Sequence, residues 1–257
     1  MKHFTLALMA AAALSTAAIA QNKVTYVSAN SSRLNMEMVQ QTEQTVQLSR
    51  YLFAGYNTLC LPMSVSAEQL AQDGITVERL AAIGQEGSTL NLYFVDCTAE
   101  GIQAGYPYLV YSQKTQSLRV RNTDAMTISS DLQTVRMNDN QGNQVSFSSS
   151  WESIEQVGRY GIPAQQNVTP LESVLVRTEA DKTFLPTRCG FTWETQSPTA
   201  QELRIQHVTM ADVTAINATL MNGERVNGEI YDLNGRRVTN MTRPGVYVVN
   251  GSTVIVK

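Results

Sequence analysis

Histidine and cysteine are scarce in this sequence of 257 residues, which contains two histidines and three cysteines. A structural zinc site needs about four His or Cys ligands close together, so this composition does not favour one. The sequence also lacks the HExxH zinc helix, the GxSxG nucleophile motif, the P-loop and the GxGxxG dinucleotide motif. We therefore assign no catalytic residue, no cofactor and no metal. We expect His207 to be an ordinary histidine on a strand face.

An excess of basic residues is also missing, since 19 Lys and Arg stand against 22 Asp and Glu. A surface for nucleic acid or anionic membrane needs a basic patch, so the predicted partners do not include nucleic acid. After the first twenty residues, no stretch approaches the roughly twenty apolar residues of a transmembrane helix. The sequence therefore predicts no transmembrane span.

The three cysteines, Cys60, Cys97 and Cys189, are too few and too scattered for a disulfide scaffold. Their number is odd, so at least one is unpaired within the chain. Cys60 with Cys97 is the first pairing to consider. The alternative is three small buried side chains, which is the usual environment of free cysteine. Because Cys60 lies between two leucines of an expected strand, we predict that it is buried.

The first twenty residues, Met1 to Ala20, have the three parts of a secretory signal peptide. Lys2 supplies the positive charge, an apolar run follows, and Ala18-Ile19-Ala20 is an A-x-A cleavage site. We expect the mature protein to begin at Gln21. This segment predicts export through the inner membrane.

Short strand-forming runs separated by polar turns predict an all-β fold, an antiparallel β-sandwich over residues 21–211. Residues 21–44 are expected to be largely irregular. Ser66 and Gln69 have the spacing of a capping box, which predicts one short helix from Ala67 to Gln72 that stops at Gly74. Strands are expected at 45–53, 55–62, 76–82, 88–97, 106–112, 117–123, 132–137, 144–151, 171–177, 183–185, 189–194 and 201–210. A linker is expected at 212–226.

The last thirty residues contain two Asn-Gly pairs, Asn234-Gly235 and Asn250-Gly251, each between strand-forming runs. Asn-Gly accepts the positive φ angles of a two-residue hairpin turn. We therefore predict two β-hairpins joined at Pro244-Gly245, in a C-terminal module over residues 227–257. The expected cross-strand pairs are Asp232–Arg237, Tyr231–Val238, Tyr247–Val254 and Val246–Ile255.

This C-terminal module resembles the sorting domain of type IX secretion cargo in Gram-negative bacteria. The resemblance covers residues 213–257. It is carried by the segments Ile230–Val238, Pro244–Gly251 and Val254–Lys257. It implies that the type IX secretion machinery is a partner and that the protein crosses the outer membrane to be secreted or held at the cell surface. The residues that match the sorting motif are Tyr231, Asp232, Gly235, Arg236, Pro244, Gly245, Tyr247, Gly251 and Lys257.

A second resemblance concerns the preceding residues, 51–210. The segments Tyr56–Pro62 and Ala104–Val110 are similar to those of a β-sandwich module in secreted surface proteins of the same bacteria. The family pattern has an aromatic residue where this sequence has Met63, and a small residue where it has Tyr106. The resemblance implies a fold and a location rather than a reaction.

These observations favour a non-enzymatic exported or cell-surface protein, structural or adhesive. One alternative is a glycan- or peptide-binding module, for which an exposed row of aromatic residues is the expected sign. A less favoured alternative is a hydrolase, which needs two buried carboxylates within about 10 Å. Candidate carboxylates are Asp96, Glu100, Glu152 and Glu155. The candidate aromatic residues, which we expect to be core or half-buried, are Trp151, Trp193, Tyr106, Tyr108, Tyr111 and Tyr160.

Overall fold

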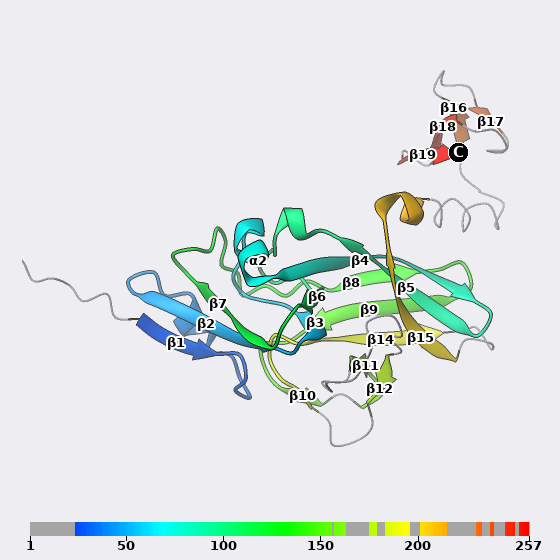
Figure 1. Ribbon diagram of the computed structural model, residues 1–257. Coiled ribbons are helices and arrows are strands. Elements are labelled where there is room, and N and C mark those ends of the chain that lie inside the picture. The colour runs from blue at the N-terminus through cyan, green and yellow to red at the C-terminus, as the bar shows by residue number, and fades with distance from the viewer. Residues whose placement is uncertain are drawn as a thin grey trace, which may run out of the picture.

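The computed structural model has an all-β, sandwich-like fold with a few short helices (Figure 1). It describes residues 24–155, 157–162, 175–178, 183–195 and 201–214, and the C-terminal strands 230–232, 237–238, 245–249 and 252–256. The expected signal peptide and the motif residues Gly235, Arg236, Pro244, Gly251 and Lys257 lie outside the described residues.

A three-stranded sheet with the order β1-β2-β7 lies at one end of the sandwich (Figure 1). It comprises β1 (Val24–Ser28), β2 (Thr45–Leu52) and β7 (Gln116–Arg121). The strand β1 runs parallel to β2, and the short helix α1 (Met36–Val39) lies between them in the chain. The prediction of irregular structure before residue 45 was therefore wrong for β1 and α1. The strands of a parallel pair are joined by a crossover connection and not by a tight turn, so no turn motif in the sequence marks the pair.

Two five-stranded sheets form the body of the sandwich, with the orders β15-β5-β4-β6-β3 and β12-β11-β14-β9-β8. A short β10–β13 pair lies beside them. The first sheet comprises β3 (Gly55–Leu59), β4 (Ile75–Glu86), β5 (Thr89–Asp96), β6 (Tyr108–Ser112) and β15 (Glu202–Val208). The second comprises β8 (Val135–Asn138), β9 (Asn143–Ser149), β11 (Tyr160–Gly161), β12 (Val176–Arg177) and β14 (Cys189–Thr195), and the short pair is β10 (Ile154–Glu155) with β13 (Thr183–Phe184).

The core between these two sheets is built around three aromatic rings. Phe147 and Phe191, paired on β9 and β14, stack with ring centroids 4.3 Å apart. Phe94 of β5 meets both rings edge-on, at 5.9 and 6.2 Å. Such edge-on and stacked contacts add to the stabilisation that aromatic burial provides.

The strand β5 is buried on both faces. Leu90, Leu92 and Phe94 face the main core, while Tyr93 and Val95 pack with Ala82 and Val213 in a second cluster. Residues 210–214 are helical. Because Val213 is buried there, the described part of the expected linker, 212–214, packs on the sheet.

The predicted helix is α2 (Ala67–Asp73), preceded by Ser66 and followed by Gly74 in the left-handed conformation. The Ser66 hydroxyl accepts a hydrogen bond from the Gln69 amide N–H at 3.3 Å, as expected for the capping residue. The Gln69 side chain does not complete the capping box. Its Nε2 instead donates to the Arg119 carbonyl oxygen on β7 at 2.7 Å, so a tertiary contact replaces the local one.

The C-terminal strands pair with one another in a four-stranded sheet with the order β17-β16-β18-β19 (Figure 1). It comprises β16 (Ile230–Asp232), β17 (Arg237–Val238), β18 (Gly245–Val249) and β19 (Ser252–Val256). The predicted pairs Tyr247–Val254 and Val246–Ile255 are confirmed.

The first hairpin differs from its prediction by one residue. Tyr231 pairs with Arg237 and Ile230 with Val238, so the predicted Tyr231–Val238 and Asp232–Arg237 pairs were wrong. Asp232 instead pairs with Tyr247, because β16 also lies against β18. A shift of one residue reverses which side chains share a face, and the pairing with β18 imposes a constraint that the turn sequence does not contain.

We predict that Gly105→Ala destabilises the fold by about 2 to 4 kcal/mol. Gly105 has a φ of +76°, and an added Cβ would lie 1.9 Å from the Asp131 carbonyl oxygen. The matched control is Gly87→Ala, where φ is +60° but nothing lies within 4 Å of the added atom. Strain at a positive φ alone costs about 1 kcal/mol. Urea unfolding of the two variants measures the difference, and equal losses would contradict the backbone contact at Asp131.

Candidate functional site

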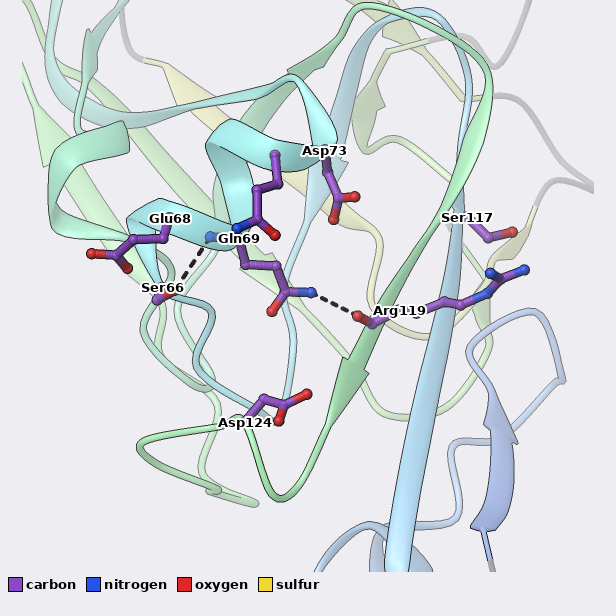
Figure 2. Close-up of a pocket in the computed structure, with 8 residues that line it drawn as sticks. Ser66, Glu68, Gln69, Asp73, Ser117, Arg119 and Asp124 are labelled. Carbon is purple, nitrogen blue, oxygen red and sulfur yellow. Dashed lines mark hydrogen bonds between the residues drawn. The ribbon is translucent and has the colours of Figure 1, made fainter.

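A polar hollow opens beside α2, with a volume of about 440 Å³ (Figure 2). The helix contributes Glu68, Gln69 and Asp73, and Arg119 comes from β7. The Glu68 carboxylate, at the start of the helix, accepts hydrogen bonds from its own backbone N–H and from the Ser66 hydroxyl. These bonds, the backbone one most, lower the pKa of Glu68. The lining residues are Ser66, Glu68, Gln69, Gln72, Asp73, Ser117, Arg119 and Asp124. These contacts are those of a solvated helix end.

His207 lies on a strand, β15, as the sequence suggested, and two side chains contact its ring. Its Nδ1 lies 2.7 Å from Oε2 of Glu78, which is on β4. The Tyr56 ring of β3 stacks on the imidazole with centroids 4.5 Å apart and an interplanar angle of 19°. The Glu78 side chain is 11% exposed and that of His207 is 28% exposed. The cluster therefore lies at the solvent boundary of the sandwich.

The pKa of Tyr56 reflects the partial burial of this cluster. Burial, the nearby Glu78 carboxylate and Tyr111 raise the pKa of Tyr56 to about 12. The phenol therefore stays protonated near neutral pH. The Tyr111 ring meets the Tyr56 ring edge-on, with the ring centroids 5.1 Å apart.

A carboxylate that holds one imidazole nitrogen is the arrangement by which a histidine is oriented as a general base. Such a base also needs a nucleophile within hydrogen-bond distance. Among the described residues, Glu78 is the hydrogen-bonding partner of His207, and no Ser, Thr or Cys side chain is hydrogen-bonded to the ring. Glu78 is also the one buried carboxylate in the described part of the chain. The arrangement of two buried carboxylates therefore does not occur there.

The carboxylates that the sequence offered as candidates have other roles. Glu100 pairs with Arg79 at 2.7 Å, and Glu152 pairs with Arg33 at 3.1 Å. Asp96 accepts a hydrogen bond from the Thr98 amide, and Glu155 is exposed on β10. The structure does not bring these four together.

The aromatic residues named from the sequence are core or half-buried, as expected. Tyr108 is buried, while Tyr106, Trp151, Tyr160 and Trp193 pack against the two cores. Both indole N–H groups are used, at 2.7 Å to Ser130 O and at 3.2 Å to Asn143 Oδ1. These residues do not form an exposed platform.

Exposed aromatic residues occur elsewhere, on the outer face of the β1-β2-β7 sheet. Tyr26 on β1 is 73% exposed and Tyr51 on β2 is 37% exposed. Arg119 and Arg121 of β7 lie on the same face, since they pair with Ser49 and Gln47 of β2. Sequence reasoning missed this face because β1 was not predicted.

All three cysteines are free and buried. Cys60 and Cys189 belong to the core between the large sheets, whereas Cys97 belongs to the core beside the three-stranded sheet. The Cys60–Cys97 pairing is therefore not found, and the prediction that Cys60 is buried is confirmed. Burial raises the pKa of the Cys60 thiol to about 12, so its reactive thiolate form is rare near neutral pH.

No protein-family model, curated protein or solved structure matched this chain in the three comparisons made. Over the residues that the structure describes, His, Cys, Asp and Glu side chains do not gather in groups of three suited to a metal ion. Within the same residues, the helices are too short or too polar to cross a membrane.

We predict that His207→Ala destabilises the protein by about 1 to 3 kcal/mol, because Glu78 is left largely buried without its partner. His207→Gln, which keeps a hydrogen-bond donor at this position, is the matched variant and should lose less. Urea unfolding at neutral pH compares the two. A wild-type midpoint for His207→Ala would show that the pair contributes nothing to stability.

Proposed function

We propose that this chain is an exported, non-enzymatic protein, structural or adhesive, whose C-terminal sheet is an address for the type IX secretion machinery. The sandwich is the part that acts at the cell surface or outside the cell. Two features of the sequence support this proposal. The expected signal peptide would direct the chain across the inner membrane, and the sorting-like module would direct it across the outer membrane.

The observation that carries the proposal is the pairing inside the C-terminal sheet. β16 and β18 lie within two of the three segments that resemble a sorting domain, and the two strands pair with each other. Asp232 is opposite Tyr247, which places two motif residues from separate segments in one cross-strand pair. Gly245 is opposite Val256 of the third segment. Strand pairing thus brings residues from separate segments of the motif together in one sheet.

Removal of the C-terminal sheet tests this proposal. A variant that ends at Thr214 retains the buried Val213, so we expect its unfolding midpoint to stay close to that of the full mature chain. A sheet of this size can bury only a little apolar area, so we expect its removal to cost the sandwich little stability. We expect the truncated protein to accumulate in the periplasm, measured by fractionation and immunoblotting. The matched control is the full chain with Val176→Ala, an exposed position outside the module.

Two results would contradict the proposal in different ways. Normal release of the truncated protein would remove the sorting role. A large loss of stability on truncation would make the C-terminal sheet a structural part of the sandwich.

The outer face of the β1-β2-β7 sheet supports a second candidate function, binding of a glycan. Tyr26 and Tyr51 offer apolar ring faces, and Arg119 and Arg121 offer hydrogen-bond donors beside them. Arg121 Nε is held at 3.2 Å by the Gln47 Oε1 between the strands. Two arginines on a protein of net charge −3 favour a glycan that carries carboxylate or sulfate groups.

We predict that Tyr26→Ala and Tyr51→Ala each weaken glycan binding about tenfold, because aromatic anchors dominate such contacts. A glycan array with the mature protein identifies the ligand, and titration calorimetry measures the variants. Met126→Ala is the control, since Met126 is also exposed but lies outside this sheet. Equal binding by all three variants, or binding of acidic peptides alone, would remove the glycan function from this face.

A further inference from the structure

Four buried side-chain atoms of the described residues have no hydrogen-bond partner. They are Arg50 Nε, Ser153 Oγ, Thr187 Oγ1 and Arg188 Nε. Each can donate a hydrogen bond. A buried donor without an acceptor costs about 1 to 3 kcal/mol, so native structures contain few of them.

The four residues come from three segments, which are β2, the residues after β9 and the turn before β14. Arg50 is on the inner face of β2, between the buried Leu48 and Leu52. Thr187 and Arg188 belong to the turn before β14, where the Thr187 amide donates to the Ser150 carbonyl oxygen at 3.2 Å. Ser153 lies three residues after Ser150, and the next residue, Ile154, pairs with Phe184.

Two of these four residues are arginines, Arg50 and Arg188. Arg50 is 3% exposed, and Arg188 is close enough for its charge to act on it. Burial first, and then Arg188, lower the pKa of Arg50 to about 9. Burial also lowers the pKa of Arg188. Neither arginine has a carboxylate partner among the described residues, and the neighbouring Glu152 is paired with Arg33.

The backbone of the turn before β14 is strained at Thr187, one of the four residues. Leu185 to Arg188 form a turn in which the Arg188 N–H lies 3.3 Å from the Leu185 carbonyl oxygen. Pro186 is the second residue, and Thr187 is the third, with a φ of +68°. Glycine is the residue that normally accepts this angle in such a turn. A β-branched residue there is an outlier that costs about 1 to 3 kcal/mol.

We propose that Arg50, Thr187 and Arg188, with Ser153 beside them, form a binding site for a small oxyanion such as phosphate or sulfate. The two guanidinium groups supply positive charge and hydrogen-bond donors, and the two hydroxyls supply further donors. None of these four groups carries a negative charge. Arg50 uses a second nitrogen, Nη1, to donate to the Tyr51 carbonyl oxygen, which holds its side chain inside the core. Arg188 is half-buried as a whole residue, although its Nε is buried.

This site differs from the outer face proposed for glycans. Residues of a strand alternate between its two faces, so Arg50 points into the sandwich while Tyr51 points out. Loss of glycan binding and loss of anion binding are therefore separable by experiment.

Inorganic phosphate and sulfate, titrated into the full mature chain, test the proposal. A bound anion stabilises the folded state by mass action, so the thermal midpoint should rise and calorimetry should show saturable binding. Sodium chloride at equal ionic strength controls for screening. Saturation also distinguishes the site from the general stabilisation that these salts give by exclusion from protein surfaces. Glucose 6-phosphate, in a parallel titration, shows whether the site takes an ester-linked phosphate or the free ion.

Thr187→Gly is the sharpest variant, because glycine relieves the positive φ while the hydroxyl is removed. We expect a midpoint without phosphate that is equal to or above wild type, together with anion affinity reduced about threefold to tenfold. Arg188→Gln, at the half-buried arginine, should weaken binding about tenfold to a hundredfold. Arg33→Gln is the matched control, since this exposed arginine on a nearby segment pairs with Glu152.

The proposal is overturned if wild-type protein shows no saturable response beyond that of sodium chloride. It is equally overturned if Thr187→Gly and Arg188→Gln respond to phosphate as Arg33→Gln does. Saturable binding by wild type and Arg33→Gln, weakened in the other two variants, supports it. Competition by glucose 6-phosphate would then identify a phosphoester as the class of ligand, and its absence the free anion.

Discussion

The aromatic contact between the two large sheets is the interaction on which the rest of the structure depends. Phe94 comes from one sheet, and the stacked pair Phe147–Phe191 comes from the other. Each ring buries apolar surface worth about 1.5 to 3 kcal/mol, and their mutual geometry fixes how the sheets lie across one another. Phe94 pairs with Leu80 of β4 and His207 of β15, so its position also sets those of the strands that contain Glu78 and His207.

The strand β2 joins the two candidate binding regions. Its outward residues belong to a polar, aromatic and basic face, and its inward residues belong to the core, with one exception at Arg50. A buried guanidinium among leucines costs free energy unless it is paired. Thr187 and Ser153 also have buried hydroxyl groups without a hydrogen-bond partner. An arrangement with several unfavourable features in one place is typical of a site for a ligand rather than of ordinary packing.

Predictions that rested on local rules were the most successful. Ser66 and Gly74 bound a helix because a capping hydroxyl and a left-handed glycine act within one turn of chain. The pairing of β18 with β19 follows from the turn between them. The register of β16 and β17 did not follow from its turn, because β16 also pairs with β18. The strand β1 was missed because its partner β2 is parallel and distant along the chain.

The sequence by itself determined the β-rich character, most strand positions, the α2 caps and the burial of Cys60, since these depend on periodicity and on neighbours in the chain. The tertiary structure alone decided which polar groups meet. Glu78 and His207 are 129 residues apart along the chain, and Arg50 lies near Arg188 only after the core has formed. The sequence also does not indicate that Thr187 has a positive φ. Such contacts arise from the packing of whole sheets, and short-range sequence patterns contain no information about that packing.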